Sequence, residues 1–344
     1  MLSAYEIDRQ NLNETRVKRM DIYFFGTGAG TPTTRRNVTS MALRMYEERG
    51  TYWMFDCGEG TQHQVMRSPL KLTKCEFIFI THLHGDHLFG LPGLLASRSS
   101  QGATTPLTVF GPQGLGDYMK TVFGVSRTEV EYPLLIKEID AGVVWSDEHF
   151  TVTALPLEHR IPCFGYRIQE KDRVGKLKFE LLRDKGIPPG PIYGQLKKGE
   201  DVTLPDGELL FAASVLGEPI PGRSVAILGD TRPCDNAVRL ARHVDLLVHE
   251  ATFMADKAEN AHEFGHSTAM QAAEIAKKAG AKKLALTHFS SRYKDEEMMN
   301  KLLEEARQIF PSTHLADDHH VIMVADTDEE AASTADESTE DADQ

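Results

Sequence analysis

The feature that most limits how this chain can fold is a short apolar run that ends in four potential metal ligands. Residues 77–80 read Phe-Ile-Phe-Ile, which is typical of a buried strand, and the chain then reads His-Leu-His-Gly-Asp-His from His82 onward. Because side chains alternate along an extended segment, His82 and His84 point the same way, whereas Asp86 and His87 follow a glycine and can reach a second position. Imidazole and carboxylate groups suit Zn²⁺. The cluster therefore predicts metal binding, in preference to a solvated polar loop.

Three further potential ligands also follow apolar runs. Asp230 follows a run that begins at Ser224, His159 follows the strand expected at 150–155, and His288 ends another apolar run. A carboxylate in such a place can bridge two cations about 3.5 to 4 Å apart. A single histidine is more often a hydrogen-bonded structural residue. The shared placement after apolar runs nevertheless predicts that these three side chains complete a two-metal centre.

Strand and helix patterns alternate along the chain. The apolar runs favour strands at 22–25, 40–46, 52–56, 76–81, 107–110, 150–155, 165–169, 208–212, 224–228, 245–249, 283–287 and 320–324. Helical patterns occupy 60–66, 88–97, 114–122, 235–241, 268–279 and 295–308, and Ser267 is the expected N-cap of the fifth. Strand meanders come first and strands interleaved with helices follow. This order suits a four-layer α/β/β/α sandwich better than a doubly wound sheet.

Charge is distributed unevenly along the 344 residues. The net charge of −13 argues against a polyanionic partner, but nine of the acidic residues lie in 326–344, which has no Lys or Arg and is expected to be a disordered tail. Residues 171–200, by contrast, contain eight Lys or Arg and four acids. Because Gly and Pro also gather in 171–203, we expect an inserted arm that protrudes from a domain spanning 20–325, with an ordinary surface loop as the alternative.

The remaining features bear on the compartment. No apolar run reaches the roughly 18 to 20 residues that span a bilayer, and residues 1–19, an expected N-terminal extension, lack the apolar core of a signal peptide. The four cysteines are scattered without a CxxC pair, which indicates reduced and mostly buried thiols. We therefore expect a cytoplasmic protein without a membrane partner.

Further motifs make the likeness to a known family specific. The order HxHxDH, a lone His, GDT and a late His resembles the metallo-β-lactamase superfamily. Five other segments narrow the resemblance to ribonuclease Z, the endonuclease that removes the 3′ trailer from precursor tRNA: GTGAGTP at 26–32, FDCGEGTQ at 55–62, HEATF at 249–253, GHST at 265–268 and LTHFSSRY at 286–293. The likeness extends from about residue 21 to residue 324.

The resemblance implies a set of site residues and a partner. It implies two Zn²⁺ per subunit, held by two groups of three ligands and one carboxylate that both share: His82, His84 and His159; Asp86, His87 and His288; and Asp230. It also implies that Asp86 accepts a proton from the nucleophilic water, that His266 protonates the leaving oxygen and that Glu250 orients His266. The implied partner is precursor tRNA, gripped by the arm of a homodimer and cut to leave a 3′-hydroxyl on the tRNA and a 5′-phosphate on the trailer.

One loop departs from the family pattern. The PxKxRN loop reads Pro-Thr-Thr-Arg-Arg-Asn at 32–37, with Thr34 where Lys is expected, so that Arg35 is the candidate for supplying the charge. Discrimination at the tRNA 3′ end is therefore open. Asp56 is expected to orient a ligating histidine, and His262 is assigned no role.

Two other functions remain open. A dizinc hydrolase of a small ester, thioester or other phosphodiester would use the same metals, but it would not need a basic arm remote from them. An RNA-binding protein with a vestigial site is disfavoured, because all seven ligand positions hold competent residues.

Overall fold

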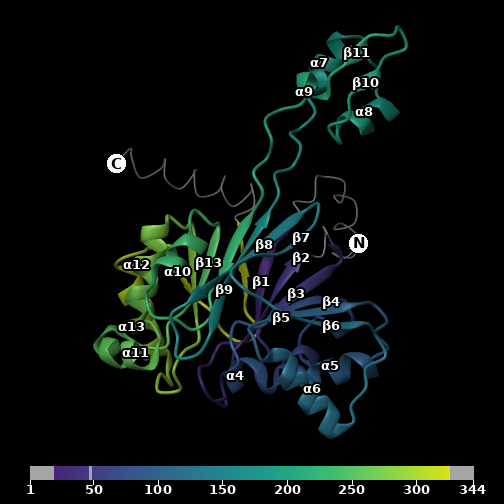
Figure 1. The fold of residues 1–344 in the computed structure, drawn as a ribbon. Coiled ribbons are helices and arrows are strands. Elements are labelled where there is room, and N and C mark those ends of the chain that lie inside the picture. Colours follow the sequence, from purple (N-terminus) through teal and green to yellow (C-terminus); the bar gives the residue numbers. More distant parts are fainter. Residues whose placement is uncertain (1–18, 46–48, 326–344) are drawn as a thin grey trace, which may run out of the picture.

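Two seven-stranded sheets form the centre of the molecule (Figure 1). The computed structural model describes residues 19–45 and 49–325, so that the expected acidic tail, most of the expected N-terminal extension and residue 46 of an expected strand lie outside it. The first sheet has the order β16 (Val321–Met323), β1 (Asp21–Gly26), β2 (Ser40–Met45), β3 (Thr51–Phe55), β4 (Cys75–Phe79), β5 (Leu107–Gly111) and β6 (Leu134–Glu138). The second has the order β15 (Thr313–Leu315), β14 (Lys283–Thr287), β13 (Leu246–Glu250), β12 (Ser224–Ile227), β9 (Cys163–Glu170), β8 (Phe150–Leu157) and β7 (Gly142–Ser146).

The sheets bury both faces because their strands carry apolar residues on both sides. In β1, Ile22 and Phe24 enter the core between the two sheets, whereas Tyr23 and Phe25 enter the core on the outer face. Successive side chains of a strand point to opposite faces, so one continuous apolar run serves two cores. The strand β12 repeats the pattern in the second sheet.

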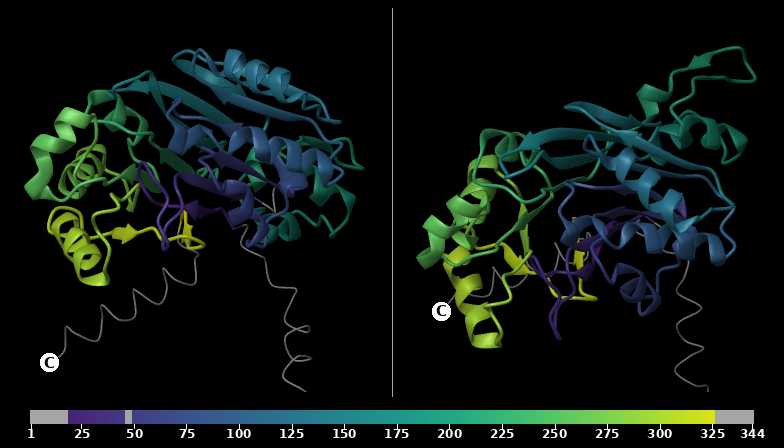
Figure 2. Two further views of the ribbon diagram at one scale, coloured as in Figure 1. Left: turned by 90° about the horizontal axis from the view of Figure 1, so that it is seen from below. Right: turned by 60° about the horizontal axis from the view of Figure 1, so that its bottom comes forward.

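Helices cover the outer face of each sheet and complete four layers (Figure 2). The first sheet is covered by α3 (Thr61–Met66), α5 (Leu91–Ser100) and α6 (Leu115–Ser126), and the second by α10 (Asp235–Leu240), α12 (Ala269–Ala279) and α13 (Glu296–Arg307). The predicted α/β/β/α sandwich is confirmed. The N-cap of α12 is Thr268 and not the expected Ser267, because Thr268 and Gln271 form a reciprocal capping box, while the Ser267 hydroxyl donates to the carbonyl of Thr231.

Residues 171–222 leave the second sheet between β9 and β12 and project away from the sandwich (Figure 1). They contain α7 (Phe179–Asp184), α8 (Pro191–Leu196), β10 (Val202–Thr203), β11 (Leu209–Leu210) and α9 (Ala212–Val215), packed around a small apolar core of their own. At the base, buried Glu170 accepts hydrogen bonds from the Nε of Arg223 at 2.8 Å and from its backbone N–H at 3.1 Å. The projecting segment is therefore longer than the expected 171–203.

Other expectations about the elements need correction. The strand expected at 208–212 lies in the projecting segment, where β11 pairs with β10 and not with either large sheet. The sequence did not predict β6, β7 or β15, which lie at or near the sheet edges. Within the described ranges, no helix is both long enough and apolar enough to cross a bilayer.

Candidate metal centre

The seven expected ligands converge where strands of both sheets end. The strands β8, β12, β13 and β14 run in the same direction, so the loops that follow them meet at one edge of the second sheet. The loop after β4 and the short helix α4 (Gly85–Leu88) reach this edge from the first sheet. These loops carry the ligands in the order His82, His84, Asp86, His87, His159, Asp230 and His288.

Three histidines form the first group of expected ligands. The Nε2 atoms of His82 and His159 each lie 3.1 Å from Nδ1 of His84. The Nδ1 of His159 donates to the carbonyl of Gly265 at 2.7 Å, which leaves a lone pair on its Nε2. Burial lowers the pKa values of all three imidazoles, which are therefore neutral at pH 7.

The tautomer of His82 is fixed by its neighbour in the sequence. The hydroxyl of Thr81 donates to Oδ2 of Asp56 at 2.9 Å, so it can only accept from Nδ1 of His82 at 3.0 Å. The Nε2 of His82 consequently also presents a lone pair to the group. Neutral imidazoles that turn lone pairs toward one point form a site for a cation.

Asp86, His87 and His288 form the second group. The Nε2 atoms of His87 and His288 are 3.3 Å apart. The Oδ2 of Asp86 lies 3.4 Å from Nε2 of His288 and 3.6 Å from Nε2 of His87. Nδ1 of His87 donates to Oδ2 of Asp56 at 2.7 Å. Burial alone would lower the pKa of His87, but the charges of Asp230, Asp56 and Asp86 raise it well above its usual value. The carboxylates thus favour a positive charge at this point.

Asp230 lies between the two groups. Its Oδ2 is 3.4 Å from Nε2 of His288, 3.5 Å from Nε2 of His87 and 3.7 Å from Nε2 of His82. Burial would raise the pKa of this carboxyl, but the neighbouring histidines lower it well below its usual value. Ligands about 2.0–2.1 Å from a tetrahedral Zn²⁺ lie about 3.3–3.4 Å from one another, close to the separations found in both groups. The donor set therefore suits metal binding, with Asp230 next to ligand candidates of both groups.

His266 lies beside the ligands with a different partner. The Nδ1 of His266 lies 3.8 Å from Oδ2 of Asp230, close enough for both atoms to bind one metal ion. This Nδ1 instead donates a hydrogen bond to Oε1 of Glu250 at 3.0 Å. Glu250 ends β13 and is almost fully buried. Burial would lower the pKa of His266, but the charge and hydrogen bond of Glu250 raise it to about 9. The side chain is therefore an imidazolium at neutral pH.

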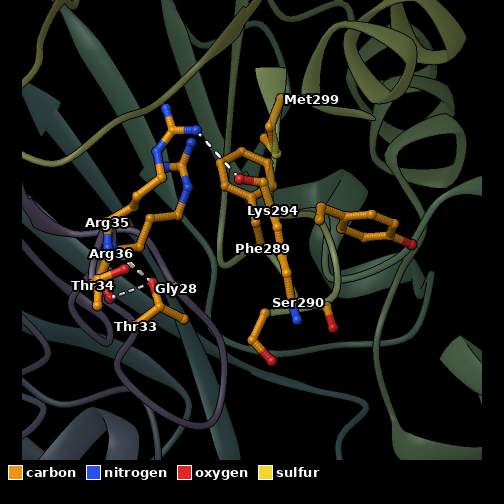
Figure 3. A pocket seen from close by; sticks show the side chains of 11 residues that line it. Gly28, Thr33, Thr34, Arg35, Arg36, Phe289, Ser290, Lys294 and Met299 are labelled. Carbon is orange, nitrogen blue, oxygen red and sulfur yellow. Dashed lines mark hydrogen bonds between the residues drawn. The ribbon is translucent and has the colours of Figure 1, made fainter. Parts of the chain in front are cut away.

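A pocket of about 300 Å³ lies next to the centre, between the loop at 28–36 and the segment that follows His288 (Figure 3). Thr34, Arg35 and Lys294 are among its lining residues. The loop is tied to the centre because the N–H of Gly30 donates to Oδ2 of Asp86 at 2.7 Å.

The two loop arginines differ in freedom. Arg36 lies 4.8 Å above the ring of Phe289 and donates to the carbonyl of Ala316 at 3.1 Å, so it has a fixed position. Arg35 is exposed and donates to the carbonyl of Lys294 at 3.3 Å. The sequence reasoning identified Arg35 as a cation here but missed Lys294, which directly follows the LTHFSSRY segment at 286–293.

Comparison with known proteins agrees with this geometry. Residues 51–175 and 204–289 match the model of the beta-lactamase superfamily domain, which omits much of the projecting segment. The ribonuclease Z of Bacillus licheniformis is 54% identical over 301 residues, covering 88% of this chain and 98% of that protein. The ribonuclease Z of Limosilactobacillus fermentum is 52% identical, covering 89% and 98%.

A solved structure gives the same result. The crystal structure of the short form of human tRNase Z is 33% identical, with a TM-score of 0.65, and covers 89% of this chain and 100% of that chain. The resemblance stated from the sequence motifs is thus confirmed by whole-chain similarity, by the fold and by the matched domain. This chain belongs to the ribonuclease Z family of the beta-lactamase superfamily.

Proposed function

We propose that this chain is a zinc-dependent endoribonuclease that removes the 3′ trailer of precursor tRNA, with two Zn²⁺ per subunit. The endoribonuclease activity follows from membership of the family. The observation that carries the zinc proposal is the convergence of five imidazoles and two carboxylates, with neighbouring donor atoms such as those of His82 and His84 3.1 Å apart and those of His82 and Asp230 3.7 Å apart. His82, His84 and His159 would hold one cation, Asp86, His87 and His288 the other, and Asp230 both.

The protein groups around the scissile phosphate would divide the proton transfers between them. Bound cations would supply Lewis acidity, lowering the pKa of a water and neutralising charge on the phosphate. Burial would raise the pKa of Asp86, but His87 and His288 lower it below its usual value, so the carboxylate is ionised at neutral pH. Its place beside the centre would let it accept a proton from the nucleophilic water. His266, protonated and held by Glu250, would donate a proton to the departing ribose 3′-oxygen. This assignment leaves a 3′-hydroxyl on the tRNA.

The exposed cations of the projecting segment support the proposal that the substrate is a large polyanion. All eight Lys and Arg side chains in 171–200 are exposed, and they lie on a part of the chain that extends away from the centre (Figure 1). Such cations bind phosphates and position a nucleic acid without reading its sequence. We propose that the segment, which includes Gly190 and Pro191, grips the body of the tRNA. We also propose that the protein acts as a homodimer in the cytoplasm.

The decisive experiment compares two labelled RNAs. Purified protein is incubated with a precursor tRNA and with the matched mature tRNA that ends in CCA, each with and without a chelator, and both product ends are mapped. Cleavage of the precursor to a 3′-hydroxyl and a 5′-phosphate, abolished by the chelator and restored by Zn²⁺, is expected. Metal-dependent hydrolysis of bis(p-nitrophenyl) phosphate without cleavage of the precursor would instead favour a hydrolase of small substrates.

A further inference from the structure

Glu250 contacts more than the imidazole of His266. Its Oε1 accepts the N–H of Thr231 at 2.9 Å as well as Nδ1 of His266 at 3.0 Å. Its Oε2 accepts the backbone N–H of Thr252 at 3.2 Å and also the Thr252 hydroxyl. An ionised carboxylate only accepts hydrogen bonds, so the Thr252 hydroxyl must donate its single proton to Glu250.

That donation determines how Thr252 interacts with the metal centre. Nδ1 of His288 lies 2.9 Å from the same hydroxyl oxygen. Because the hydroxyl proton is already directed to Glu250, this second contact must be a donation from Nδ1 of His288. The tautomer of His288 is then fixed with the lone pair on Nε2, the atom that lies 3.4 Å from both Asp86 and Asp230.

His288 depends on this contact for two reasons. Its backbone has φ of 59°, a left-handed conformation that is strained for a non-glycine residue and persists only where surrounding contacts hold it. The carbonyl of Thr252 also accepts the N–H of Ser290 at 3.4 Å, so Thr252 contacts both the strained residue and the turn that follows it. Both His288 and Thr252 are buried, so water cannot readily replace the hydroxyl.

We propose that Thr252 is a positioning residue through which Glu250 serves two groups at once, His266 directly and the ligand His288 through the Thr252 hydroxyl. The inference deepens the proposed function and rests on its metal centre. The inference predicts different effects on the metal centre for two substitutions, each of which removes a hydrogen-bond partner of Glu250. Removing the imidazole of His266 leaves the chain from Glu250 through Thr252 to His288 intact, whereas removing the hydroxyl of Thr252 breaks that chain and leaves Glu250 on His266.

The test measures zinc affinity with Thr252→Val, because valine keeps the β-branched shape and replaces the hydroxyl by a methyl group of similar size. Loss of a hydrogen bond that orients a ligating histidine typically lowers metal affinity about 10- to 100-fold. Competition against a chromogenic chelator at fixed pH should therefore show that the affinity for one of two zinc ions falls about 10- to 100-fold, while the affinity for the other is unchanged. Thr252→Ser, which restores the hydroxyl, should return the affinity to near the wild-type value, and His266→Ala should keep the wild-type affinity.

Thermal unfolding of the chelator-treated variants separates positioning from packing. Similar unfolding temperatures for Thr252→Val and the wild type, together with selective weakening of one zinc, support the inference. Equal zinc affinity in the two proteins overturns it, as does an equal loss of both ions that Thr252→Ser fails to restore. If the wild-type protein itself binds no zinc, both the proposed function and this inference fail. If the wild-type protein binds zinc but Thr252→Val has the same affinity, only the role of Thr252 is refuted.

Discussion

Replacing His266 by alanine tests the division of labour in the centre most directly. The interaction with Glu250 raises the pKa of His266 from 6.5 to about 9, which corresponds to about 3 kcal/mol in favour of the imidazolium. The side chain is then mostly protonated at pH 7.5. A general acid contributes about 10²- to 10⁴-fold to a rate, so single-turnover cleavage of precursor tRNA at saturating zinc should fall by that factor.

The nature of the leaving group distinguishes acid catalysis from a structural effect. The ribose 3′-oxygen needs a proton as it departs, whereas p-nitrophenolate leaves readily without one. Hydrolysis of bis(p-nitrophenyl) phosphate should therefore change little in His266→Ala. On the tRNA substrate, the wild-type rate should decline as pH rises through about 9, because the acid loses its proton, and this decline should be absent from the variant.

A matched control lies four residues earlier in the chain. His262 is exposed on α11 (Ala258–Phe264), so His262→Ala should retain the wild-type rate and the alkaline decline. Loss of zinc from His266→Ala would identify His266 as a ligand and refute the assignment. Equal loss of activity toward both substrates would also refute it, because a missing general acid cannot slow a reaction that needs none.

Three other changes test the remaining parts. Glu250→Gln, assayed at saturating zinc, should move the alkaline decline toward lower pH, because burial lowers the pKa of His266 and the largest charge that opposes this effect is removed; an unchanged profile would contradict the pairing. Asp230→Ala should lose more than one of about two zinc ions by elemental analysis, and loss of none would refute the shared ligand. Replacing residues 173–220 by a short Gly-Ser linker removes exposed cations, so KM for precursor tRNA should rise and its salt dependence should flatten. Hydrolysis of bis(p-nitrophenyl) phosphate should survive this deletion. Unchanged tRNA kinetics would show that the segment is only a solvated arm.

The sandwich was predictable because its strands are short apolar runs whose two faces enter two different cores. The edge strands β6 and β7 escaped prediction because they alternate half-buried and exposed positions, as at Leu135 and Val143. The run at 208–212 is locally indistinguishable from a core strand, but it packs into the separate core of the projecting segment. Which of two cores an apolar run joins depends on contacts between residues distant in the sequence. The Thr268 cap, in contrast, was readable from the spacing to Gln271.

The sequence pattern named the ligand candidates but not their protonation. A histidine placed after a strand can be found from the sequence, since strand direction brings such loops together. Its tautomer depends on the group that contacts its other nitrogen, and those groups come from elsewhere: Asp56 for His87 and Thr252 for His288. Asp56 was expected to orient a ligating histidine, and the structure places it on His87. Thr252 lies in the HEATF segment but has no distinctive chemistry until the structure places it between Glu250 and His288.

Opposite pKa shifts on neighbouring imidazoles explain why this arrangement suits cations better than protons. The rings of His82 and His87 have centroids 4.1 Å apart, yet burial lowers the pKa of His82 while carboxylates raise that of His87. A proton on one ring repels a proton on the other, so protonation can neutralise the carboxylates only in part. A divalent cation places its charge between the ligands and uses every lone pair at once. Because the ligands come from loops of both sheets, bound cations would also tie the two sheets together at this edge, and metal affinity would then be coupled to the stability of the fold.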